Sequence, residues 1–291
     1  MVKSNLKEQK VIKKADLKVV DNNAVKTTAY SDINLKKWRE YDHIKTDNLW
    51  EFPNRLKEGG HSNEYHGNYI PQIAQQIYER YTKKNDIVLD LFFGSGTSGI
   101  EAINMGRRCI GVELKDELAE SVSEKFTPKQ LVTDVNIICA DSASEIAKEK
   151  IKARLDIMGA KKAQLLMLHP PYDDIIKFSD KKEDLSNCAT TEEFYDLFEK
   201  VAKNGYDLLE KGRFACLIIG DKYANSQHIP LGFECMARMN KLGFITKAII
   251  IKDMQGNERA KGKTANLWRY RALAGGFYIF KHEYVMVFQK V

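Results

Sequence analysis

The sequence predicts a three-layer α/β domain, doubly wound around a mostly parallel seven-stranded sheet whose last strand is antiparallel. Short apolar runs alternate along the chain with segments whose apolar residues recur at helical spacing, which indicates repeated strand–helix units. A glycine-rich turn follows the first apolar run, as is typical of the first crossover in such a sheet. No clear helix separates the last two runs, so we expect these two strands to pair antiparallel.

The expected strands are short runs of aliphatic and aromatic residues, typical of strands that are covered on both faces. They span 86–93, 108–113, 135–140, 164–168, 214–219, 244–251 and 284–288. The expected helices carry apolar residues three and four positions apart. They span 70–81, 97–105, 117–125, 191–209 and 231–242. The chain has 291 residues, enough for one such domain, which we place at 47–291.

The first 46 residues are polar and weakly periodic, and they predict a basic, flexible extension. Eleven Lys and Arg residues stand against seven Asp and Glu residues between Met1 and Trp50. An arm that contacts nucleic acid phosphates is the alternative interpretation. The whole chain has a net charge of +6, which permits a polyanionic partner without requiring one.

Several classes of protein are disfavoured by the composition. No run approaches the roughly 20 apolar residues that cross a bilayer, and the Lys-rich start differs from a secretory signal. The five cysteines are widely spaced and form no C-x-x-C pair, which indicates reduced thiols rather than disulfides or a zinc site. We therefore expect a cytoplasmic protein with no membrane and no metal partner. The oligomeric state stays open.

The strongest local signal is the turn Asp90-Leu91-Phe92-Phe93-Gly94-Ser95-Gly96-Thr97. Glycine allows a ligand to approach the backbone closely after the first strand. The turn is not a Walker loop, because no Lys-Ser/Thr follows its second glycine. It also differs from dinucleotide sites, because the strand ends in the acid Asp90. That charge disfavours a pyrophosphate and suits a cationic ligand, such as the ammonium group of a methionine moiety.

Two more acids end the next two predicted strands. Glu113 follows the second strand about 20 residues on, where a carboxylate can accept both ribose hydroxyls of an adenosine. Asp141 follows the third strand, where it can contact an adenine amino group. Each acid alone is equally consistent with a helix cap or a solvated turn, but with Asp90 they outline a nucleoside pocket above the sheet.

A second signal is His169-Pro170-Pro171-Tyr172 at the end of the fourth predicted strand. Two prolines fix the backbone and remove two N–H donors, which leaves carbonyl groups free to accept from a substrate amino group. Tyr172 offers a flat face on which a base can stack. A rigid loop around a buried tyrosine is the alternative.

Together the two motifs resemble those of the amino-methyltransferases that form N6-methyladenine or N4-methylcytosine in DNA. The cofactor motif of that family reads D-P-F-x-G-S-G-T, matched here, with Leu91 replacing the proline, at Asp90, Phe92, Gly94, Ser95, Gly96 and Thr97. Its catalytic motif reads D/N/S-P-P-Y, matched at Pro170, Pro171 and Tyr172. The segment 61–73, which begins at His61, resembles the one that closes over the methionine end of the cofactor. The resemblance covers about 61–290.

The resemblance implies a Rossmann-like fold, S-adenosylmethionine as cofactor, S-adenosylhomocysteine as product, and DNA as partner, as in restriction-modification systems. It implies cofactor contacts from His61, Glu113, Asp141 and the matched residues of the glycine-rich turn. It implies a catalytic role for the four residues of the second motif. The motifs leave adenine and cytosine open as targets.

His169 departs from the family pattern, which has Asp, Asn or Ser at this position. Those side chains accept a hydrogen bond from the target amino group. A neutral imidazole also accepts one, through a single nitrogen, whereas an imidazolium does not. We therefore expect activity to fall at acidic pH, near the ordinary histidine pKa of about 6.5.

The residues that would recognise the target are less clear, because no large insertion separates the two motifs. Two polar segments are candidates, 173–190 and 252–281. The second predicts a nucleic acid contact loop through Arg259, Lys261, Lys263, Arg269 and Arg271. A solvated basic loop is the alternative.

Three other functions fit some of these features. An RNA base amino-methyltransferase would carry the same catalytic motif. A catalytically impaired protein that binds S-adenosylmethionine and nucleic acid would follow if His169 abolishes activity. A methyltransferase for small molecules fits less well with the P-P-Y turn and the basic loop.

Overall fold

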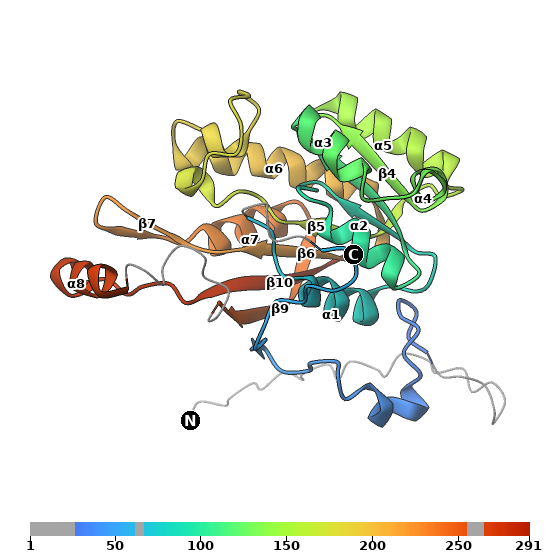
Figure 1. Ribbon diagram of the computed structural model, residues 1–291, viewed down its shortest axis with the longest axis horizontal. Helices are drawn as coiled ribbons and strands as arrows, with labels where there is room; N and C mark the ends of the chain where they lie inside the picture. The colour runs from blue at the N-terminus through green and yellow to red at the C-terminus, as the bar shows by residue number, and fades with distance from the viewer. Residues whose placement is uncertain (1–26, 62–66, 255–264) are drawn as a thin grey trace, which may run out of the picture.

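The computed structural model describes residues 27–61, 67–254 and 265–291 and contains one large sheet (Figure 1). The strand order is β1-β9-β10-β6-β5-β2-β3-β4. The strands are β1 Leu49–Trp50, β2 Ile87–Asp90, β3 Arg108–Glu113, β4 Val135–Cys139, β5 Ala163–Leu168, β6 Leu209–Ile219, β9 Phe244–Asp253 and β10 His282–Lys290. Only β10 runs antiparallel to its neighbours, β6 and β9. The doubly wound, mostly parallel sheet with an antiparallel last strand is thus confirmed.

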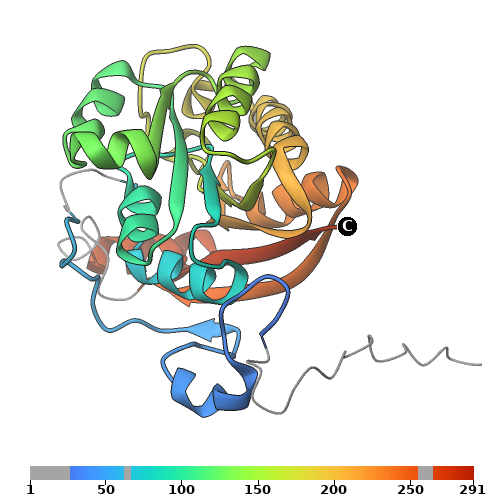
Figure 2. The same cartoon turned by 90° about the vertical axis from the view of Figure 1, so that its right-hand side faces the viewer.

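Helices cover both faces of the sheet and enclose two separate cores (Figures 1 and 2). One core contains apolar residues of α1 Pro71–Tyr81, α2 Thr97–Asn104 and α3 Asp116–Ser123. The other contains residues of α5 Glu145–Ile157, α6 Thr191–Leu208 and α7 Leu231–Lys241. Alternate residues of one strand serve the two cores: in β5, Leu165 and Met167 face the first, and Leu166 and Leu168 the second.

The chain reverses its direction of winding next to β2. From β2 it moves outward through β3 to β4, and it then returns to β5 on the other side of β2. Asp90, the last residue of β2, is level with Gly111 of β3 and with Met167 of β5. The ends of these strands therefore border a switch point, the place where open α/β sheets form their ligand crevices.

Several elements differ from the expectation. The sheet has eight strands rather than seven, because the two-residue β1 pairs in parallel with β9. The structure also contains elements that were not expected: the hairpin β7 Lys222–Ala224 and β8 Gln227–Ile229, and the helices α4 Pro128–Thr133, α5 and α8 Ala265–Gly275. The helix α4 has only six residues, α5 is largely polar, and no described side chain of α8 is buried. In α5 only Ala147, Ile151 and Leu155 are buried, too few to dominate the local pattern.

Residues 27–46 lie against the domain rather than forming a free extension. They contain the 3-10 helix Leu35–Tyr41. The Lys45 N–H donates to Gln76 of α1 at 2.7 Å, and the Lys84 N–H donates to Asp32 at 2.7 Å. Residues 1–26 of the predicted extension lie outside the described residues.

Two further findings concern the described part of the chain. None of its helices is long and apolar enough to cross a membrane. Nor do its His, Cys, Asp and Glu side chains form a group of three or more arranged to hold a metal ion.

The glycine-rich turn is anchored by Phe93, whose ring fills a space left by two glycines, Gly99 and Gly111. A Cβ atom on Gly111 of β3 would lie 2.2 Å from that ring, and one on Gly99 would lie 2.8 Å away. Gly96 has a φ of 84°, and a Cβ atom there would meet Val122 at 2.7 Å. Packing at this density leaves no room for an added methyl group.

Substitution of Gly111 by alanine is therefore expected to displace Phe93. We predict that Gly111→Ala lowers the free energy of unfolding by about 1–3 kcal/mol, measured by urea denaturation. Phe93→Leu in the same chain should recover part of the loss, because it frees the space that the new methyl group needs. Losses that simply add in the double variant would contradict this account of the packing.

Candidate active site

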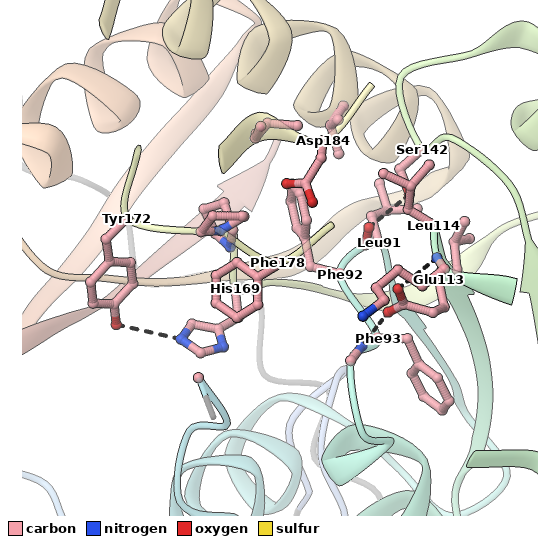
Figure 3. A pocket seen from close by; sticks show the side chains of 18 of the residues that line it. Leu91, Phe92, Phe93, Glu113, Leu114, Ser142, His169, Tyr172, Phe178 and Asp184 are labelled. Atoms are coloured by element: carbon pink, nitrogen blue, oxygen red, sulfur yellow. Dashed lines mark hydrogen bonds between the residues drawn. The ribbon is translucent and has the colours of Figure 1, made fainter. Parts of the chain in front are cut away.

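A cavity of about 270 Å³ opens at the carboxyl ends of β2, β3 and β5 (Figure 3). Residues of both predicted motifs share its wall. The predicted residues that line it are Phe92, Gly94, Thr97, Glu113, Asp141, His169, Pro170, Pro171 and Tyr172. Four other residues predicted to bind the cofactor are not part of the lining: His61, Asp90, Ser95 and Gly96.

Glu113 ends β3 with its carboxylate against the glycine-rich turn. Its two oxygens accept hydrogen bonds from the backbone N–H groups of Gly94 and Lys115, each at 2.9 Å. Burial raises the pKa of this carboxyl, and the two N–H groups oppose that shift. Each carboxylate oxygen has a second acceptor site. Glu113 can therefore bind hydroxyl groups that a ligand presents from the cavity.

Asp90 lies beneath the turn rather than on the cavity wall. Its carboxylate accepts from the Phe92 N–H at 2.9 Å and from the Ser98 hydroxyl. The Tyr69 hydroxyl lies 2.5 Å from the Ser98 oxygen and extends this chain. The Asp90 side chain is buried, which raises its pKa to about 6. A cationic group bound above the turn would favour the ionised form of Asp90.

Asp141 forms a hydrogen bond within its own turn, which is the local role that the sequence left open for it. One of its oxygens accepts from the Ala143 N–H at 2.9 Å, in the turn that leads to α5. Ser144, three residues on, is the N-cap of that helix. Asp141 still lines the cavity, so its second oxygen remains available to a ligand.

The predicted catalytic turn leaves β5 after Leu168 and brings His169 and Tyr172 together (Figure 3). The Tyr172 oxygen lies 3.4 Å from His169 Nε2, and the Tyr172 hydroxyl donates to Glu283 at 2.8 Å. A Cβ atom on Gly220, just after β6, would lie 2.9 Å from the Tyr172 ring. The glycine at this position therefore leaves the space in which the tyrosine lies.

The environment of His169 corrects the expected pH dependence. The imidazole opens on the cavity, but the surrounding protein shields it enough to lower its pKa to about 4. Glu283 opposes this shift, and Lys252 adds to it. His169 is therefore neutral, and able to accept a hydrogen bond, well below the pH of about 6.5 at which an exposed histidine becomes charged.

Several lining residues were not identified from the sequence. Tyr69 packs edge-to-face on His169, with ring centroids 5.3 Å apart. Asn68 places an amide nitrogen in a buried position without a hydrogen-bond partner among the described residues. Phe178 and Asp184 come from the polar segment after the catalytic turn. A buried acid such as Asp184 carries no distinctive local pattern, because its burial depends on contacts made elsewhere.

His61 lies away from the cavity and contacts α2. Its Nε2 is 2.6 Å from a Glu101 oxygen, and both side chains are almost fully buried. The other oxygen of Glu101 is buried and has no hydrogen-bond partner within the described part of the chain. This contact fixes the chain directly before residues 62–66, which are outside the described residues.

Two of the five predicted nucleic acid contacts lie on an exposed helix. Arg269 and Arg271 are solvent-exposed on α8, and the Arg271 guanidinium lies 5.3 Å from the Trp268 ring centre. Arg259, Lys261 and Lys263 fall outside the described residues. Lys252, assigned to the same basic segment, is instead buried in β9. The segment 252–281 is therefore not a continuous loop.

Contacts connect α8 to the rim of the cavity through the β7–β8 hairpin. Phe277, just after α8, stacks on Tyr223 of β7 with ring centroids 4.5 Å apart. Lys222 of β7 pairs with Asp173 at 2.9 Å and also with Asp174, directly after the catalytic turn. In the ribbon view α8 and the β7–β8 hairpin lie on the same side of the molecule (Figure 1).

Comparisons with known proteins agree with the motifs. One relative is a probable type III restriction-modification enzyme, the HindVI Mod subunit of Haemophilus influenzae, 33% identical over 33% of this chain and 13% of that protein. Another is the DNA adenine methyltransferase YhdJ of Escherichia coli, 33% identical over 38% of this chain and 35% of that protein. The matches therefore span about a third or less of these relatives.

Similarity to solved structures is limited to the general fold. TrmN from Thermus thermophilus has a TM-score of 0.48 and 15% identity over 78% of this chain and 50% of that protein, which supports no conclusion about activity. The family evidence is broader, because the profile of a family described as DNA methylase matches residues 3–124 and 163–291. Because those two segments make up most of the sequence, the chain belongs to the DNA methylase family.

Proposed function

We propose that this protein transfers a methyl group from S-adenosylmethionine to the exocyclic amino group of a DNA base, adenine N6 or cytosine N4. The observation that carries the proposal is the shared cavity. Its wall combines the acidic ends of β3 and β4 with the His169–Tyr172 turn, so a nucleoside cofactor and a flat base would meet in one space. The relatives named as DNA methyltransferases support the same activity.

The cofactor half of the cavity suits a nucleoside with a cationic tail. Glu113 would accept the ribose hydroxyls, and Asp141 would accept from the adenine amino group. Asp90, beneath the turn at Gly94, would supply negative charge near the methionine ammonium. His61 would act indirectly, through its contact with Glu101. Bound S-adenosylmethionine would supply the methyl group. The substrate amino nitrogen would form the new N–C bond as the S–C bond breaks, which would leave S-adenosylhomocysteine, and the amino proton would pass to water.

The base half of the cavity suits an unstacked nucleotide. A base in duplex DNA has to leave the helix to reach it, as other enzymes that modify bases require. Tyr172 would stack on the flipped base, and Pro171 would hold the turn rigid. The Pro170 carbonyl and His169 would accept the two amino hydrogens and thus orient the nitrogen. Most of the rate would then come from positioning rather than from proton transfer.

Substrate DNA would extend from the cavity toward the basic helix. Arg269 and Arg271 are exposed on α8, where they can contact phosphates. The stacked pair Tyr223 and Phe277 connects this helix to the hairpin beside the catalytic turn. We propose that α8 and the β7–β8 hairpin hold the DNA while the target base occupies the cavity. Arg259, Lys261 and Lys263 would add to this surface.

Methyl transfer from labelled S-adenosylmethionine, with duplex DNA and bulk RNA in parallel, tests the proposal. Digestion to nucleosides and mass spectrometry should find label in N6-methyladenine or N4-methylcytosine of DNA. Tyr172→Ala should lower kcat/KM by roughly 5- to 150-fold, because base–aromatic stacking contributes about 1–3 kcal/mol. Label confined to RNA would establish the RNA alternative. If the protein binds the cofactor but labels neither DNA nor RNA, the result would favour a nucleic acid binding protein without methyltransferase activity.

The shielded position of His169 predicts the pH dependence of kcat. With DNA and cofactor saturating, so that the titration of Asp90 does not limit binding, kcat should hold from pH 8 to pH 5.5. A histidine of ordinary pKa would keep only about a tenth of its neutral form at pH 5.5. In His169→Asn, which has no titrating ring, any loss of rate near pH 4 should disappear. A wild-type midpoint near pH 6.5 would contradict the shielding of this imidazole.

Charge reversal on α8 tests the DNA surface. Arg269→Glu/Arg271→Glu should weaken DNA binding and flatten its dependence on salt, because each lost phosphate contact lowers the salt slope by roughly one. Lys161→Glu/Lys211→Glu is a matched control, since it makes the same change of charge near the amino ends of β5 and β6, at the opposite edge of the sheet. Fluorescence anisotropy at several salt concentrations measures both. Equal losses in the two variants would rule out a specific role for α8.

A further inference from the structure

A chain of four polar side chains runs from the interior of the sheet to the cavity. Lys252 of β9 and Glu283 of β10 are paired residues of adjacent strands, with Nζ and Oε1 3.0 Å apart. The other Glu283 oxygen accepts from the Tyr172 hydroxyl at 2.8 Å. The Tyr172 oxygen in turn lies 3.4 Å from His169 Nε2.

The ion pair at the base of this chain is unusual for its burial. Lys252 is 2% exposed and Glu283 is 6% exposed. A buried ion pair is weak evidence for stability, because removing both charges from water offsets much of their mutual attraction. Glu283 lines the cavity and bonds to Tyr172, and this position indicates a role in the cavity.

The Lys252–Glu283 ion pair fixes the direction of each hydrogen bond that links these four side chains. The Lys252 ammonium holds the pKa of the Glu283 carboxyl below its ordinary value, even though burial acts in the opposite direction. Glu283 is therefore an ionised carboxylate, which only accepts hydrogen bonds. Tyr172 must donate its single proton to Glu283, so its oxygen is left as an acceptor for His169.

The protonation of the imidazole follows from this direction. His169 is neutral in its shielded position, so only one of its ring nitrogens carries a hydrogen. A contact between Nε2 and an oxygen that can only accept favours the hydrogen on Nε2. Nδ1 then keeps its lone pair, and it is the nitrogen that points away from Tyr172 (Figure 3).

We propose that Glu283, held by Lys252, is a positioning residue that acts through Tyr172 to set the tautomer of His169, with the proton on Nε2 and the acceptor Nδ1 presented to the target amino group. The inference rests on the proposed function for the role of Nδ1, but the tautomer itself does not depend on it. It gives a physical reason why an imidazole can replace the Asp, Asn or Ser of the family motif.

Neighbouring contacts hold the turn in the geometry that this chain requires. Gly220 leaves room for the Tyr172 ring, as described above. On the other side Asp173 has a φ of 53°, a left-handed backbone conformation that residues other than glycine rarely adopt. Its carboxylate accepts from Lys222 at 2.9 Å and from Thr191 at 2.7 Å. Tyr172 is thus restrained on both sides while its hydroxyl points to Glu283.

Nitrogen-15 NMR of histidine-labelled protein at pH 7.5 tests the tautomer without any activity measurement. The His169 signals are identified by their loss in His169→Asn. The wild type should show the hydrogen on Nε2 alone. The double variant Lys252→Met/Glu283→Gln removes both charges, so that neither is left unpaired. In this variant part of the His169 population should carry the hydrogen on Nδ1. A wild-type ring with the hydrogen on Nδ1, or an unchanged tautomer in the double variant, would overturn the proposal.

A double-mutant cycle between Tyr172→Phe and His169→Asp tests the consequence for methyl transfer. Tyr172→Phe keeps the stacking ring and the Lys252–Glu283 pair, so KM for DNA should hold while kcat falls about 2- to 12-fold, the value of one hydrogen bond. In a His169→Asp background the same change should cost less than about 2-fold, because either carboxylate oxygen accepts. Equal losses in both backgrounds would show a purely structural role for Tyr172 and contradict the proposal.

The two experiments separate this inference from the proposed function. Suppose that no methyl group is transferred to DNA, but that wild-type His169 carries its hydrogen on Nε2 and the double variant carries part of it on Nδ1. This result would overturn the proposed activity and support the positioning role of Glu283. Methyl transfer with the hydrogen on Nδ1 would do the reverse.

Discussion

The parallel pairing of β2 with β5 is the constraint on which the site depends. The pairing sets Asp90 level with Met167, so the glycine-rich turn and the His169–Tyr172 turn leave the sheet side by side although about 70 residues separate them in sequence. Tyr69 contacts both, through Ser98 on the cofactor side and through the His169 ring on the other. Because the strand ends are fixed in one rigid sheet, the two turns keep their relative position without a linking loop.

The site combines close apolar packing with buried charge. Phe93, packed against Gly99 and Gly111, fixes the turn sterically, whereas Asp90 and the Lys252–Glu283 pair place charge where water is largely excluded. Buried charges reduce stability unless they are paired or bonded, and each of these groups has its partners within the fold. Departures from an apolar core are expected at functional sites, and here they lie beneath the two turns that the proposed cofactor and base would contact.

Much of the architecture was predictable because it depends on local pattern. The strand–helix alternation, the antiparallel last strand, the glycine-rich turn and the three acids at successive strand ends were read from neighbouring residues and agree with the fold. The helices α4, α5 and α8 were missed because each leaves too weak a periodic signal. The helix α4 has six residues, α5 has three buried residues, and no described side chain of α8 is buried. The strand β1 was missed because two residues make no pattern, and only its pairing with β9 defines it.

The sequence by itself determined the fold class, the two motifs and the family they resemble. The tertiary structure decided which predicted residues share a cavity, placing Glu113, Asp141 and Tyr172 on its wall and Asp90 and His61 behind it. It also decided that His169 stays neutral to about pH 4 and that Lys252 is a buried partner of Glu283 rather than part of a basic loop. Residue type and spacing are local properties, whereas burial, pKa and hydrogen-bond direction depend on groups that only the folded chain brings together.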